Sequence, residues 1–183
     1  MLLTTLLLAF AQQSTITPKE ALALAFPECK VERVVHYPDK KQKARAGKLA
    51  GAKVETKTVR AYRATNKEGK FVGTGYFDSH KVRTKAQTLF IVVAPDQSIS
   101  RVEVLRFDEP PEYKPKAKWF AKFKGLKLDK KLQVKQSIPS LTGATLSARA
   151  TTSAVRRVLA LHQVLYPKKP AAPAKKDDSK PKR

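Results

Sequence analysis

The chain reads Thr142-Gly143-Ala144-Thr145-Leu146-Ser147 directly before the longest helical pattern in the sequence. From Ser147 onward, apolar residues recur at spacings of three and four as far as Leu165. This spacing places them on one face of a helix that lies on a hydrophobic core. Because proline cannot continue a helix, we expect the helix to end before Pro167. The hexapeptide is therefore the start of a long, core-packed helix.

The hexapeptide has two properties that matter at a helix start, namely hydroxyl side chains and a small, accessible backbone. The first N–H groups of a helix have no partner within it, and the positive end of the helix dipole favours a negative group there. Gly143 and Ala144 leave the backbone open, so a phosphate could bind. The same residues also suit an ordinary cap, in which Thr145 or Ser147 accepts a hydrogen bond from a backbone N–H. The pattern alone leaves both interpretations open.

The rest of the chain predicts an α+β domain in which helices pack against an antiparallel sheet of about four to six strands. Thr17, Pro18 and Glu20 form a helix start with a capping box. A second, very basic helix is expected from Asp39 to Leu49, ended by Gly51. The apolar run at residues 88–94 is expected as the central strand. Strands are predicted at residues 31–36, 54–64, 71–77, 88–94 and 99–107.

The hexapeptide resembles the flavinylation motif of the FMN-binding domain, a family that includes flavin subunits of the sodium-pumping NADH:quinone oxidoreductase and of the Rnf complex. The family pattern is Asp, two variable residues, Ser or Thr, and then Gly-Ala-Thr. Its last threonine carries FMN through a phosphodiester bond. Here that threonine corresponds to Thr145, residues 142–144 match before it, and Leu146 and Ser147 fit the usual continuation. The resemblance implies FMN bound covalently to Thr145.

Four further segments resemble a small exported subgroup of the same family, at residues 76–84, in the strand after them, at 107–113 and at 119–125. In the segment 78–84, which is expected as a loop between two strands, Arg83 and His80 can donate to anionic oxygen. Taken singly, each of these side chains also fits an ordinary surface position. The loop with Glu109 lies near the flavin in related domains. Besides Thr145, the expected flavin contacts are Thr142, Gly143, Ala144, Leu146, Ser147, His80, Arg83, Thr84 and Glu109.

Two other features leave a flavin contact as one alternative. Gly73 and Gly75 interrupt a strand, which indicates either a β-bulge or a group close to the backbone, such as a flavin ring. Trp119, Phe120 and Phe123 stand at helical spacing, which favours a core-facing stripe over stacking on a flavin.

The resemblance implies electron transfer, in which FMN passes electrons between redox partner proteins, rather than a stand-alone enzyme. A flavin transferase, using FAD as donor and magnesium as its own cofactor, would attach the FMN. Pro139 departs from the family pattern, which has Asp at this position. This departure keeps a flavin-free accessory domain of the same fold as an alternative.

The charge of the chain suggests anionic partners. Lys and Arg number 38 against 15 Asp and Glu, which gives a formal net charge of +23. Such charge fits nucleic acid, acidic proteins or an anionic membrane surface. The sequence shows no RNA-binding aromatic signature, zinc spacing or helix-turn-helix pattern with a basic second helix. A basic nucleic-acid or polyanion-binding module therefore remains an alternative that rests on charge alone.

Composition changes along the chain predict three parts. Residues 1–11 are apolar and end in a small-x-small pattern, which resembles a signal peptide, although an N-terminal core helix is the alternative. They are too few for a membrane span, which needs about 20 residues. Residues 12–166 are expected as one domain, and 167–183 as a disordered tail rich in Lys, Pro and Ala. The expected location is extracytoplasmic (periplasmic), with peripheral attachment at the membrane surface as one alternative. Cys29 is the single cysteine, so no internal disulfide forms.

Overall fold

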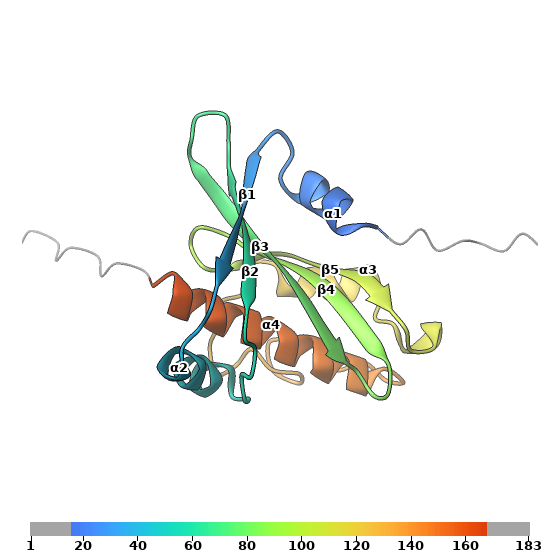
Figure 1. Ribbon diagram of the computed structural model, residues 1–183. Coiled ribbons are helices and arrows are strands. Elements are labelled where there is room, and N and C mark those ends of the chain that lie inside the picture. Colours follow the sequence, from blue (N-terminus) through green and yellow to red (C-terminus); the bar gives the residue numbers. More distant parts are fainter. Residues whose placement is uncertain (1–15, 168–183) are drawn as a thin grey trace, which may run out of the picture.

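The computed structural model describes residues 16–167, so the predicted signal peptide and tail lie outside the described residues (Figure 1). Five strands form one antiparallel sheet in the order β1-β2-β3-β4-β5. The strands are β1 Lys30–His36, β2 Val59–Thr65, β3 Phe71–Lys81, β4 Ala86–Val93 and β5 Ile99–Phe107. The helices are α1 Pro18–Ala25, α2 Lys40–Ala50, α3 Ala117–Phe120 and α4 Thr145–Leu165, with 3₁₀ turns η1 Pro111–Tyr113 and η2 Ala121–Phe123. The predicted α+β class, with an antiparallel sheet packed against helices, is confirmed.

The two N-terminal helices begin where their capping residues predict. Thr17 and Glu20 form a reciprocal capping box at α1, and Asp39 and Gln42 form one at α2. Gly51 ends α2 in the left-handed conformation with φ 70°. Each box satisfies two backbone N–H groups that the helix itself cannot pair. Local side-chain chemistry thus sets both helix boundaries.

Helices cover both faces of the sheet, and β4 separates the two cores (Figure 1). On one face, Leu89, Ile91 and Val93 pack with α2, α4 and the buried aromatic residues 119–123. On the other face, Phe90 and Val92 pack with α1. A strand that is buried on both sides must be apolar at nearly every position, which explains the run at 88–94. β4 is paired on both sides, as expected, although β3 is the middle strand of the five.

The glycines of β3 accommodate phenylalanine rings of the protein itself. A Cβ atom on Gly75 would lie 2.7 Å from the Phe90 ring, and one on Gly73 would lie 2.9 Å from the carbonyl oxygen of Val93. The Phe26 ring would also lie within 3.5 Å of a Cβ atom at either glycine. A register shift in β2 occurs opposite Gly73. Close packing and an irregular register therefore explain these glycines, and the alternative of a flavin ring at this place is wrong.

Two predicted strand boundaries are wrong. β2 begins at Val59 rather than near residue 54, because the chain first makes a turn in which the Thr56 hydroxyl donates to the carbonyl of Thr58. β3 continues to Lys81, so residues 78–81 belong to a strand rather than a loop. The inward-facing side chains of Asp78 and His80 are polar, so this segment lacks the alternating apolar residues that indicate a strand. Both are satisfied by partners across the sheet and on α4.

Arg156 of α4 joins the end of α2 and the loop that precedes α4 to the long helix. Its guanidinium donates to the last carbonyls of α2, at 2.8 Å to Ala50 and 3.3 Å to Leu49. It also donates to the carbonyls of Asp129 and Leu132, at 2.6 and 3.1 Å. A cation at a helix C-terminus satisfies carbonyls that lack intrahelical partners.

Within residues 16–167, no helix is both long and apolar enough to cross a membrane.

Candidate functional site

The start of α4 lacks the side-chain cap that would be its ordinary explanation. Gly143 takes a left-handed conformation with φ 79°, and Ala144 is the N-cap residue without a capping side chain. The Thr145 hydroxyl does not accept a backbone N–H; it donates to the carbonyl of Leu141 at 3.0 Å. Within residues 16–167, the backbone N–H groups of Thr145, Leu146 and Ser147 donate to no acceptor. These three donors at the positive end of a 21-residue helix favour an anion.

A cavity of about 210 Å³ adjoins this helix start. It lies where three segments meet, namely the β3–β4 connection, the chain after β5 and the first turn of α4. Its lining consists of Val82, Arg83, Glu109, Tyr113, Gly143, Ala144, Thr145, Leu146 and Ser147. Thr145 is half-buried, and a Cβ atom on Gly143 would meet no atom within 4 Å. The wall of this cavity thus offers a hydroxyl, free backbone donors and one guanidinium group.

Glu109 fixes the loop that forms the opposite wall. Its Oε1 accepts hydrogen bonds from the backbone N–H groups of Lys85 at 2.8 Å, Thr84 at 2.7 Å and Arg83 at 3.1 Å. These backbone donors, Lys85 first and then Thr84, hold the pKa of Glu109 below its ordinary value. The residue is 7% exposed. Glu109 is therefore ionised, and it joins two loops that line the cavity.

The structure brings some of the predicted contacts together and leaves others outside the lining. Arg83, Glu109 and residues 143–147 all line the cavity. Thr142 and Thr84 are both exposed and outside the lining, and the Thr84 N–H donates to Glu109. His80 belongs to a separate polar network. Tyr113 and Val82 line the cavity although sequence reasoning did not select them; Tyr113 follows a pair of prolines that must leave the sheet, which was a usable signal.

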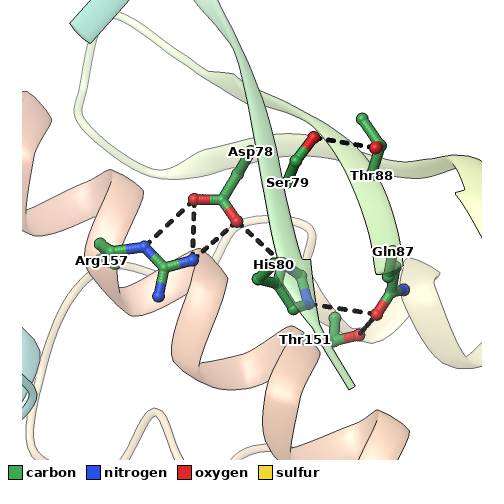
Figure 2. A network of polar contacts seen from close by, with 7 residues as sticks. All are labelled: Asp78, Ser79, His80, Gln87, Thr88, Thr151 and Arg157. Atoms are coloured by element: carbon green, nitrogen blue, oxygen red, sulfur yellow. Dashed lines mark hydrogen bonds and ion pairs between the residues drawn. The ribbon is translucent and has the colours of Figure 1, made fainter. Parts of the chain in front are cut away.

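The network around His80 joins β3 and β4 to α4 (Figure 2). Asp78 accepts from the Arg157 guanidinium at 2.7 to 3.1 Å, and the Nδ1 atom of His80 lies 2.8 Å from the same carboxylate. The Nε2 atom of His80 lies 3.2 Å from Gln87 Oε1, to which Thr151 donates at 3.4 Å. Burial alone would raise the pKa of Asp78, but the His80 hydrogen bond and the Arg157 charge lower it further than burial raises it.

This network positions the helix that carries the hexapeptide. Thr151 and Arg157 are the α4 members, and Thr151 follows Thr145 by less than two helical turns. Arg157 lies three residues after buried Ala154 and directly before buried Val158. A charged residue at that place in an apolar pattern requires a buried partner, which is the signal that could have predicted the pair with Asp78.

Comparison with known proteins gives one match. Residues 84–160 match the model of the FMN-binding domain. No curated protein and no solved structure matches the chain. The matched segment spans β4, β5 and α4 as far as Ala160, and it includes every cavity-lining residue except Val82 and Arg83. Free donors at the helix start, a neighbouring cation and an adjoining cavity fit the phosphate end of a flavin nucleotide. Residues 84–160 are therefore similar to the FMN-binding domain, and this match indicates FMN as the cofactor.

Proposed function

We propose that the protein is an electron-transfer flavoprotein that acts outside the cytoplasm and carries FMN through a phosphodiester bond to Thr145. The observation that carries this proposal is the place of the Thr145 hydroxyl. It lies on the wall of a cavity, at the first position of an uncapped helix. Thr145 is not among the buried residues of the core, so a group bonded to its hydroxyl can extend into the cavity.

The residues of the cavity would divide the binding of FMN between charge and apolar contact. The N–H groups of residues 145–147 and the Arg83 guanidinium would hold the phosphate. The half-exposed apolar side chains of Leu146 and Tyr113 would contact the isoalloxazine ring. Glu109 would keep the Arg83 loop in place. When bound, FMN supplies one- and two-electron redox chemistry, and the protein binds and orients it.

Maturation would require a flavin transferase, which is a proposal by analogy with the family. Pro139, at the position of the family's Asp, lies in the loop before the hexapeptide. The Trp119 indole donates to the Pro139 carbonyl at 2.9 Å, so the backbone of this loop is anchored to the aromatic core. This contact supports a loop that keeps its shape despite the missing carboxylate. A flavin-free accessory domain is the alternative, and the same experiment distinguishes the two.

The test is co-expression of the chain with a flavin transferase, followed by denaturation. We expect in-gel flavin fluorescence and a mass increase equal to one esterified FMN. Thr145→Ala should abolish both, and Ser140→Ala is the matched control because Ser140 is an exposed hydroxyl at a variable position of the same motif. A wild-type chain without flavin, or Thr145→Ala with as much flavin as wild type, contradicts the proposal.

The polyanion-binding alternative rests on a different surface. The exposed side chains of Lys40, Lys41, Arg45 and Lys48 lie on α2. This alternative predicts a colourless protein whose binding to duplex DNA falls steeply as salt increases. Filter binding of duplex at two salt concentrations, with and without flavin loading, measures it.

A further inference from the structure

The loops that line the cavity carry an excess of unpaired cations. Lys81, Arg83, Lys85 and Lys114 are all exposed, and each lies in the lining or within two residues of it. None of the four forms an ion pair within residues 16–167. We call these four residues the basic rim.

The carboxylates of the same loops do not neutralise the basic rim. Asp108 pairs with Arg106 at 2.8 Å, and Glu109 is bonded to three backbone N–H groups. Glu112 is exposed, and Glu109 keeps its negative charge because its partners are neutral N–H groups, which leaves two carboxylates against four cations on residues 81–85 and 108–114. The field at the cavity mouth is therefore positive.

Two apolar side chains stand at the cavity between these cations. Leu146 is 49% exposed and Tyr113 is 36% exposed, and both line the cavity. Transient protein interfaces commonly combine an apolar centre, often with Tyr, and a charged rim that is open to solvent. The cavity mouth has this composition.

We infer that the basic rim, with Leu146, Tyr113 and the flavin that they would contact at its centre, is the docking surface for an acidic electron-carrier protein. This inference rests on the proposed function, because a cofactor that is bonded to the chain exchanges electrons only with a partner that reaches the cavity. Charge complementarity then requires carboxylates on the partner around its own redox centre. Such contacts are typically small and short-lived, and their charges act mainly on the rate of encounter.

A second basic surface provides the matched control. α2, which carries the exposed cations, lies along the C-terminal half of α4. The strand before α2 is joined to the end of α4, since His36 hydrogen-bonds to Tyr166 over 2.6 Å, and the last carbonyl of α2 accepts from Arg156. In Figure 1, α2 lies at the opposite end of α4 from the β3–β4 connection. A partner that is attracted by net charge alone would use both surfaces equally.

The test compares two triple variants of the full chain with the same change in net charge. One carries Lys81→Glu, Lys85→Glu and Lys114→Glu on the basic rim, and none of these three side chains lines the cavity. The other carries Lys40→Glu, Lys41→Glu and Arg45→Glu on α2. The probe is a plant-type ferredoxin, a small acidic electron carrier, and the readout is its association rate by stopped-flow at low and high salt. Circular dichroism checks that both variants are folded.

We expect the rim variant to associate about tenfold more slowly at low salt, with the α2 variant within about twofold of wild type. The difference should vanish at about 1 M salt, where charges are screened within about 3 Å. Equal slowing by both variants overturns the inference. So does a rim variant that binds ferredoxin normally but no longer binds phosphatidylglycerol vesicles, because the rim would then be a membrane surface. Ferredoxin docking does not need bound flavin, so loss of docking and loss of flavinylation are separately observed.

Discussion

The hydroxyl of Tyr76 and Nδ1 of His162 are hydrogen-bonded over 2.7 Å, in the buried space between β3 and α4. Burial raises the pKa of Tyr76, so its proton stays on the phenol oxygen. Burial and then the charge of Arg63 lower the pKa of His162 to about 4. The imidazole is therefore neutral at pH 7. A neutral pair of this kind joins the last turns of α4 to the sheet without burying a charge.

This pair makes the fold sensitive to acid. Between pH 6.5 and about 4, the unfolded chain binds a proton at His162 that the folded chain does not bind. The free energy of unfolding is therefore highest above pH 6.5. It falls by about 3 kcal/mol in total as the pH drops through this window. Urea unfolding at pH 7, 5.5 and 4.5 measures the loss, and His162→Gln should flatten it.

His36 is the control for this prediction. Burial and then the Arg63 charge also lower the pKa of His36, but this side chain is only partly buried. His36→Gln should therefore retain most of the pH dependence. If His162→Gln and wild type lose equal stability between pH 6.5 and 4.5, His162 is not the responsible group.

Glu109 should control the mobility of the cavity loop. In Glu109→Ala, the N–H groups of Thr84 and Lys85 lose their acceptor, and amide exchange at both positions should accelerate about tenfold or more, as expected when a hydrogen bond worth about 1.5 kcal/mol is lost. Glu109→Gln keeps a carbonyl oxygen and should have a smaller effect. Hydrogen exchange by NMR measures both variants. Unchanged exchange at these two amides in Glu109→Ala would show that other contacts hold the loop.

The Asp78–Arg157 pair should be strongly coupled. Arg157→Met leaves the Asp78 carboxylate largely buried without its guanidinium partner, which should cost about 3 kcal/mol of unfolding free energy. The double variant Asp78→Asn/Arg157→Met removes both charges and should recover part of that loss. Chemical unfolding of the two single variants and the double variant completes the cycle. Additive effects would mean that the pair contributes no interaction energy of its own.

Pro139→Asp should increase flavin loading. The Trp119 indole bonds to the backbone carbonyl at this position, so the substitution can keep that contact while it restores the family's acidic residue. We expect a larger flavinylated fraction after a short co-expression with the transferase, measured by intact mass. Ser140→Asp, at the next exposed position, is the control. Equal or lower loading of Pro139→Asp would show that the transferase does not need a carboxylate there.

Local sequence patterns predicted much of the fold. The capping residues Thr17 and Asp39 set two helix starts, and the three-and-four spacing of apolar residues gave α4 as far as Leu165. These features depend on residues close together in the chain. The extension of β3 and the roles of its glycines depend on distant partners, such as Arg157 and Phe90, which local pattern cannot supply.

The candidate site was predictable in the same unequal way. The hexapeptide at 142–147 is a continuous motif, so its place at a helix start was predictable, whereas the adjoining cavity depends on distant loops. Glu109 acts through backbone N–H groups, which carry no residue-specific signal, so its clasp could not be read from sequence. His80 lies outside the cavity lining, because strand β3 turns it toward Asp78 and Gln87, and its loop-like sequence surroundings hid that strand.

Tandem mass spectrometry of the tryptic peptide 136–149, from protein made together with a flavin transferase, decides whether FMN is attached at Thr145. This peptide contains five hydroxyl residues, Ser137, Ser140, Thr142, Thr145 and Ser147, so the fragment ions locate the modification among real competitors. We predict one FMN phosphodiester on Thr145 and none on the other four. An unmodified peptide, or FMN on any other residue, would contradict the proposed attachment.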